Sequence, residues 1–142
     1  MKEHIERLKN WIVKGDHDLG TAIVVHNHIP MYSDTIAFHC QQAVEKYLKC
    51  LLEYNSISFK RSHDLRYLLD LLDESVAISE EQYSKAMKLN GFGTDIRYPD
   101  TTIQLSDTDR DEAIQIAKEF RNFLKENIDV EIDDRNLPES LV

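Results

Sequence analysis

A polar stripe with two cations lies on one face of a predicted helix. His39, Gln42, Lys46 and Lys49 follow one another at steps of three, four and three residues, so they share one helix face. Two ammonium groups beside an imidazole and an amide can hold a phosphate or the acids of a partner protein. The spacing is equally typical of a solvated face, with Glu45 and Lys49 as an ordinary i, i+4 ion pair.

A second candidate anion site is the run Lys60-Arg61-Ser62-His63-Asp64. Two cations there precede a predicted helix start, where free backbone N–H groups attract anions. Asp64 opposes an anion at this place, so the alternative is a basic loop with a helix cap. The imidazole of His63 could instead be buried and oriented by Asp64 or by a backbone group.

A third candidate is the run Arg97-Tyr98-Pro99-Asp100 in the longest irregular stretch of the sequence. Pro99 favours an extended backbone at Tyr98. A guanidinium beside an aromatic ring can hold a phosphate and stack a base. The alternative is a structural clamp in which Arg97 pairs with an acid and fixes the loop to the rest of the fold.

Motifs for metal or covalent chemistry are absent from the sequence. It contains no HExxH, no paired ExxH and no Cys/His ligand spacing, so we expect no metal and no cofactor. No phosphate-binding glycine loop and no GxSxG nucleophile motif is present either. Cys40 and Cys50 lack CxxC spacing, which favours buried free thiols in a reducing compartment.

The elements that position these residues are predicted to be helices. Only seven of the 142 residues are Gly or Pro, and apolar residues recur at three- and four-residue steps. The predicted helices cover about residues 3–27, 33–54, 63–75, 79 to about 90, and 106–127. We therefore expect an all-α fold, a four-to-five-helix up-down antiparallel bundle over residues 1–128. The acidic segment 129–142 is expected to fray.

Local signals set the predicted helix boundaries. Ser79 with Gln82 and Ser106 with Asp109 form capping boxes, and Ser62 is predicted to cap the third helix. Gly91 and Gly93 are expected to stop or kink the fourth helix. Gly15 and Gly20 either weaken the first helix or let another element approach it closely.

The formal net charge of −9 argues against binding bulk nucleic acid, because neutralising phosphates requires Lys and Arg. Residues 41–70 nevertheless carry five cations against four acids, so any polyanion site should lie near this segment. The sequence has no stretch long and apolar enough to span a membrane. Its start shows no secretory cleavage pattern, so we expect a cytoplasmic protein with no membrane contact.

Four motifs together resemble the HEPN domain family (higher eukaryotes and prokaryotes nucleotide-binding). Residues 38–49 resemble the family's F-x-x-Q-Q-A-x-E-K-x-L-K helix, and residues 62–65 resemble its H-D-L helix start. Residues 96–100 resemble its R-Y-P-D element, and residues 16–22 its D-L-x-x-A first helix. The motifs occur in the family's order and cover about residues 5–127.

This resemblance implies a helical bundle that commonly forms homodimers. Family members are often encoded beside a minimal nucleotidyltransferase, and such pairs frequently act as toxin–antitoxin systems. Many members are metal-independent RNases that use an Arg, four to six intervening residues and a His. That spacing is absent here: no His follows Arg97, and Arg61 has His63 only two residues away.

The leading hypothesis is therefore a non-catalytic HEPN-type module that homodimerises. It would bind a nucleotide, a nucleotidyltransferase partner, or both. The predicted phosphate contacts are Lys46, Lys49, His63 and Arg97, with Tyr98 as a platform for the base. One alternative is a divergent metal-independent RNase toxin that combines Arg97 with His63 or His39 across a dimer. Another is a purely structural adaptor whose polar stripe is only solvated surface.

Overall fold

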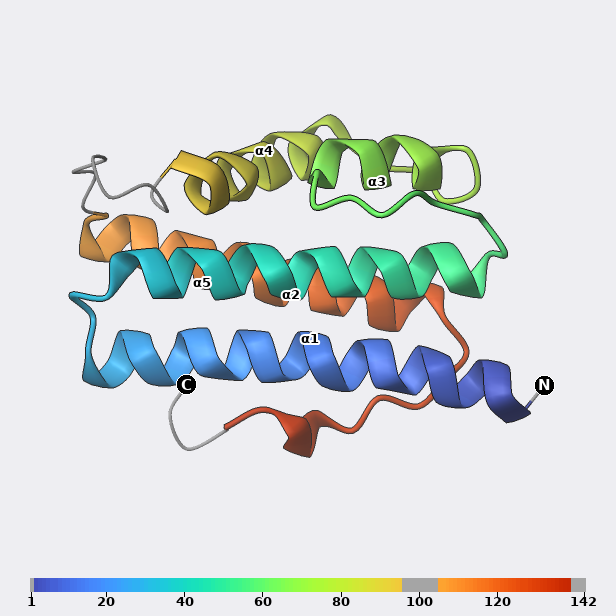
Figure 1. The fold of residues 1–142 in the computed structure, drawn as a ribbon, viewed down its shortest axis with the longest axis horizontal. Helices are drawn as coiled ribbons and strands as arrows, with labels where there is room; N and C mark the ends of the chain where they lie inside the picture. The colour runs from blue at the N-terminus through green and yellow to red at the C-terminus, as the bar shows by residue number, and fades with distance from the viewer. Residues whose placement is uncertain (1, 96–104, 139–142) are drawn as a thin grey trace.

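The computed structural model describes residues 2–95 and 105–138 and is all-helical over them (Figure 1). Its elements are α1 (Lys2–His28), α2 (Ser33–Tyr54), α3 (Leu65–Asp73), α4 (Glu80–Asp95), α5 (Asp107–Asn127) and a short 3₁₀ turn, η1 (Asp134–Asn136). The predicted all-α fold is confirmed. Figure 1 shows α1 and α4 running opposite to α2 and α5. No helix among the described residues is long and apolar enough to cross a membrane.

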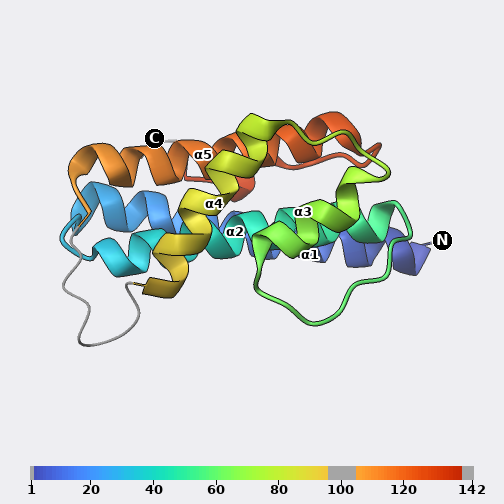
Figure 2. The same ribbon diagram turned by 90° about the horizontal axis from the view of Figure 1, so that it is seen from above.

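Helix α2 is the centre of the fold because it carries a broad apolar face. It packs against α1, α3, α4 and α5. Figure 1 shows it between α1 on one side and α3 and α4 on the other, with α5 behind it, and Figure 2 shows α4 crossing above it. Ile36, Val44 and Leu51 are completely buried, as is Tyr47. A helix with a broad apolar face is stable only when that face is covered in this way. Its remaining polar positions are therefore held in a fixed frame.

The capping predictions are correct for α4 and α5. Ser79 accepts a hydrogen bond from the backbone N–H of Gln82, and the Gln82 side chain accepts one from the N–H of Ser79. Ser106 opens α5 with the reciprocal pattern. For α3 the prediction is wrong, because Asp64 rather than Ser62 is the cap: its carboxylate accepts from the N–H of Arg66 at 3.0 Å.

The glycines differ in how closely other atoms approach them. A Cβ on Gly15 would lie 2.6 Å from Cε1 of Tyr47, so this glycine does let α2 approach α1 closely. A Cβ on Gly20 would lie 3.3 Å from Cδ of Pro138. Gly91 meets nothing within 4 Å. Helix α4 continues through it to Asp95, so of the two expected outcomes at Gly91 and Gly93, a stop or a kink, the stop does not occur.

The segment after α5 differs from its expected fraying wherever it is described. Residues 129–138 run back along α1 (Figure 1), with η1 packed on that helix. Val130, Ile132 and Leu137 pack half-buried against the core. The difference arises because Asp134 and Asn136 reach partners on α5 and α1, which the sequence pattern of an acidic tail does not reveal. A domain boundary at residue 128 remains a prediction.

Candidate functional site on α2 and the loop before α3

The first half of the polar stripe bonds to α1 through one carboxylate, that of Asp18. His39 lies with its Nδ1 2.8 Å from Oδ1 of Asp18, and Lys46 bonds the other oxygen of the same carboxylate. Burial acts to raise the pKa of Asp18, but the hydrogen bonds from His39 and Lys46 outweigh it and hold the pKa below its usual range. The carboxylate is therefore an anchor for both side chains, and Lys46 is already neutralised.

The second half of the stripe is buried. Nζ of Lys49 lies 3.0 Å from Oε2 of Glu45, and only 9% of the Lys49 side chain is exposed. The same ammonium sits 5.8 Å from the ring centre of Trp11 and 5.9 Å from that of Phe59, where cation–π attraction adds to the ion pair. The predicted i, i+4 pair therefore exists, but it belongs to the interior rather than to a solvated face.

Glu45 also fixes the loop that precedes α3. Its Oε1 lies 2.9 Å from Nδ1 of His63. The amide of Gln41 donates to the backbone oxygen of His63 at 2.8 Å. The His63 side chain is nevertheless 75% exposed. Two contacts from α2 thus hold this histidine at a fixed position with its ring open to solvent.

The loop presents cations that no described acid neutralises. Lys60 and Arg61 in the loop, and Arg66 in the first turn of α3, are exposed, and none forms an ion pair with a described residue. The N-terminus of α3 is not open to an anion, because Asp64 caps it and the N–H of Leu65 donates to Oδ1 of Asn90 at 3.3 Å. An anion at this surface must therefore be bound by side chains, not by the helix end that the sequence suggested.

Two of the predicted contacts, Arg97 and Tyr98, lie outside the described residues and remain predictions. Among the other three, the structure joins Lys49 to His63 through Glu45. It holds Lys46 apart from them on Asp18. His39 and His63, the two histidines considered for RNA cleavage, thus each bond a different carboxylate.

A second polar cluster, centred on Asp16, escaped sequence reasoning. This completely buried carboxylate accepts from the Tyr47 hydroxyl at 2.6 Å, from Nε and Nη2 of Arg121 at 2.8 and 3.1 Å, and from Asn136 at 3.2 Å. Burial acts to lower the pKa of Arg121, but hydrogen bonds to Asp16 and Asp134 raise it. One sequence signal could have identified it: Asp16 follows Ile12 by four residues, so it lies on the apolar face of α1.

Metal and thiol chemistry find no support in the described part of the chain. No group of three or more His, Cys, Asp or Glu side chains there could hold a metal ion. Cys40 and Cys50 are buried free thiols. Burial raises the pKa of both, that of Cys50 to about 12 with a contribution from Glu53. The predicted buried thiols are therefore confirmed, and they are poor nucleophiles.

The fold and this surface define a small all-α module with exposed cations on the loop before α3 that form no ion pair with a described residue. A family model described as the HEPN domain matches residues 8–128, so the chain belongs to the HEPN domain family. This confirms the resemblance seen in its motifs.

Solved structures share the fold. TT1696 from Thermus thermophilus superposes with a TM-score of 0.76 and 24% identity, over 86% of this chain and 98% of that one. ST0689, an archaeal HEPN homologue, superposes with a TM-score of 0.66 and 27% sequence identity, over 84% of this chain and 95% of that one. No curated protein matches the chain.

Proposed function

We propose that this chain is a non-catalytic HEPN module that binds the phosphate groups of a nucleotide at the loop before α3. It would act as a homodimer and with a nucleotidyltransferase partner, as in a toxin–antitoxin-like pair. The observation that carries the nucleotide site is a fixed loop with free cations. His63 is held on α2 by Glu45 and Gln41, while Lys60 and Arg61 beside it lack acidic partners among the described residues.

The residues predicted from the sequence would have different roles at this site. Lys60 and Arg61 would touch phosphate oxygens, since a side chain that binds an anion must be both exposed and not already neutralised. His63 meets only the first condition, because Glu45 bonds its Nδ1, so it would contribute through the exposed Nε2 edge of its ring. Lys49 would act indirectly as a positioning residue, because it fixes the carboxylate of Glu45 that holds His63. Lys46, paired with Asp18, would have the weaker role of shaping the α2 face. Arg97 and Tyr98 remain proposed contacts for a phosphate and for the base.

The arrangement favours binding over chemistry. Cleaving RNA requires a base or acid beside the 2′-hydroxyl and a cation on the phosphate. His39 and His63 bond two different carboxylates, those of Asp18 and Glu45, so the described residues do not bring the two histidines to one centre. Charge located on one loop of an acidic protein suits a small anion better than a long polyanion.

The nucleotide site is tested by calorimetry with ATP on the purified chain. We expect the double variant Lys60→Ala/Arg61→Ala to weaken binding by about 10- to 150-fold, the equivalent of roughly 1.5–3 kcal/mol for a charged hydrogen bond. Lys14→Ala is the matched control, because Lys14 is an exposed cation on α1 without an ion pair among the described residues. Equal binding by the wild type and both variants would remove the site.

The assembly is tested separately from the site. The HEPN family supports a homodimer and a nucleotidyltransferase partner, so we expect light scattering at micromolar concentration to give twice the 16.6 kDa chain mass. Co-purification with a co-expressed minimal nucleotidyltransferase checks the partner. A monomer that retains no such enzyme would refute this half of the proposal and leave the nucleotide site to its own test.

A further inference from the structure

The C-terminal strap, residues 129–138, lies on the bundle with half-buried apolar residues and a few hydrogen bonds, the first from the N–H of Asp129 to the hydroxyl of Tyr54 at 3.2 Å. Asn136 donates to the buried carboxylate of Asp16, and Pro138 rests on Gly20. The link to α5 is a single carboxylate, that of Asp134. Asp133 pairs with Arg135 inside the strap and so adds nothing to its attachment.

The carboxylate of Asp134 forms ion pairs with two cations on α5. Its Oδ1 lies 2.8 Å from Nη1 of Arg121, and its two oxygens lie 3.0 and 3.2 Å from Nζ of Lys125. Among the described residues, Lys125 has no other acidic partner. Two cations one helical turn apart, converging on one carboxylate, have the donor set of an oxyanion site. The Asp134 carboxylate fills it from the strap.

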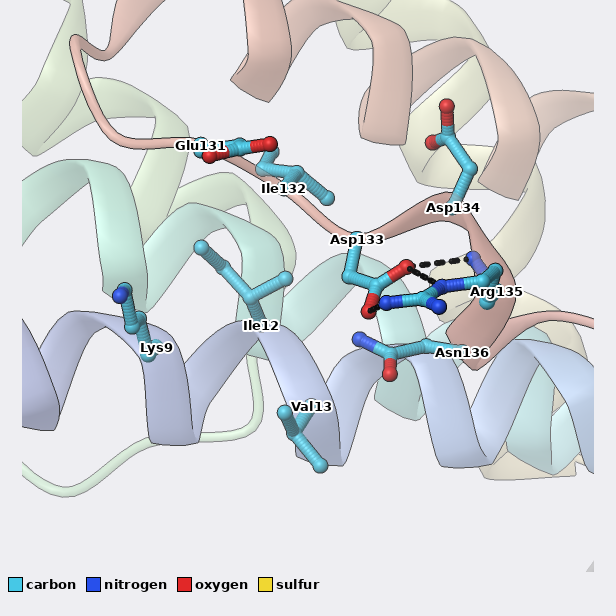
Figure 3. Close-up of a pocket in the computed structure, with 9 residues that line it drawn as sticks. All are labelled: Lys9, Ile12, Val13, Glu131, Ile132, Asp133, Asp134, Arg135 and Asn136. Atoms are coloured by element: carbon cyan, nitrogen blue, oxygen red, sulfur yellow. Dashed lines mark hydrogen bonds and ion pairs between the residues drawn. The ribbon is translucent and has the colours of Figure 1, made fainter.

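The strap leaves open space on its α1 side. A cavity of about 640 Å³ lies between α1 and the strap, with residues 131–136 on one side. Figure 3 shows Asp134 pointing away from α1, while Asp133 and Arg135 bond each other beside the opening. Lys9, on the α1 side, is exposed and forms no ion pair with a described residue. The cavity lining carries three acids, Glu131, Asp133 and Asp134, against the cations Lys9 and Arg135. It includes neither Arg121 nor Lys125, so an anion would reach those two only when the strap moves.

The two cations and the carboxylate that pairs with them belong to different parts of the chain. Arg121 and Lys125 fall inside the matched HEPN region, 8–128, whereas Asp134 lies beyond it. The strap's apolar residues are only half-buried, in contrast to the fully buried residues of α2. Segments with few buried apolar contacts open at lower free energy than the core. The strap should therefore open while the bundle remains folded.

We propose that Arg121 and Lys125 form a second anion site, which Asp134 occupies as a built-in ligand and which a free oxyanion takes over when the strap opens. The ligand class is a phosphate or carboxylate group, bound by two convergent cations. Because this ligand binds only the open form, it raises the open population by the factor 1 + [L]/Kd. At ten times Kd the increase is about elevenfold.

Amide hydrogen exchange of the full-length chain tests this competition. The reporters are the N–H groups of Asn136 and Leu137, which donate to the backbone oxygens of Asp133 and Asp134, both at 3.1 Å. Exchange is followed by NMR in increasing inorganic phosphate, in acetate, and in sodium chloride at matched ionic strength. We expect a saturable acceleration in phosphate or acetate beyond that in chloride, with core amides of α5 unchanged. The comparison of the two anions identifies the preferred group.

Variants separate a site from simple screening. Lys125→Ala should accelerate strap exchange by itself yet lose the saturable response, whereas Asp133→Asn should keep it. Lys60→Ala/Arg61→Ala should also keep it, so this result is independent of the proposed nucleotide site. Equal acceleration in phosphate, acetate and chloride would reduce the effect to charge screening and overturn the proposal. So would a saturable response that survives in Lys125→Ala.

Discussion

The two polar clusters of this fold differ in whether their charges are closed off from solvent. Around Asp16, one buried carboxylate is enclosed by donors from α2, α5 and the strap. Around Glu45, a second buried carboxylate holds one buried ammonium, Lys49, and one exposed imidazole, His63. In the first cluster, the hydrogen bonds to the carboxylate all come from inside the protein. In the second, the ring of His63 faces solvent.

This difference separates stability from recognition. A buried ion that loses its partner is strongly destabilising, so the Asp16 cluster should matter mainly to folding. An exposed group that is held in position costs the fold little stability when no ligand is bound, and it is available to a ligand. The Glu45 cluster and its loop should therefore matter mainly to binding.

The largest expected effect is on the closed cluster. Asp16→Ala leaves the buried guanidinium of Arg121 without its main counter-ion, and should lower the free energy of unfolding by about 3–5 kcal/mol. Denaturant titration measures this loss. Glu126→Ala is the control, because Glu126 is exposed on α5 and forms no ion pair with a described residue; it should change stability by less than about 0.5 kcal/mol. Similar losses in both variants would contradict a structural role specific to Asp16.

A steric change at the same cluster should come next in size. Gly15→Ala places a Cβ 2.6 Å from the Tyr47 ring, and overpacking of this kind costs about 1–3 kcal/mol. Gly91→Ala, in open space within α4, should instead stabilise by about 0.4–1 kcal/mol. Thermal unfolding of both variants compares them directly. A Gly15→Ala protein as stable as Gly91→Ala would show that α1 and α2 do not approach as closely as described.

The smallest expected effect is a pH dependence at Asp18. Burial acts to raise its pKa in the folded state, but His39 and Lys46 depress it below the usual range. The stability that it contributes is therefore fully present above the unfolded value near ~3.9 and is lost as pH falls through the folded pKa. We expect Asp18→Asn to be about 1 kcal/mol less stable than the wild type at neutral pH. That difference should shrink toward zero in acid; a difference independent of pH would contradict the assignment.

Local sequence signals predicted most of the fold. The capping boxes at Ser79 and Ser106 each involve residues three apart, so their hydrogen bonds are visible in the sequence. The boundaries of α2 follow from its apolar periodicity. The cap of α3 was missed because Ser62 and Asp64 are both good caps, and only the hydrogen bond to Arg66 decides between them.

Long-range pairing explains what the sequence could not predict about the site. Asp18 meets Lys46 across 28 positions, and Glu45 meets His63 across 18. Spacing placed the cations on one helix face and indicated the Glu45–Lys49 pair, but it could not show that Asp18, on α1, neutralises Lys46. The strap was misjudged for the same reason, since Arg121 and Asp134 lie on separate elements. The exposed cations Lys60 and Arg61 needed no such partner, and the sequence identified them as a candidate.

The central claim is that the cations of the loop before α3, not the closed cluster, receive a nucleotide. Residue-resolved NMR with ATP added to the full-length chain tests it most directly. We predict saturable shifts concentrated at residues 58–66 and at the adjoining surface of α2, with the amides around Asp16 unchanged. Shifts absent from 58–66, or confined to the Asp16 cluster, would contradict it.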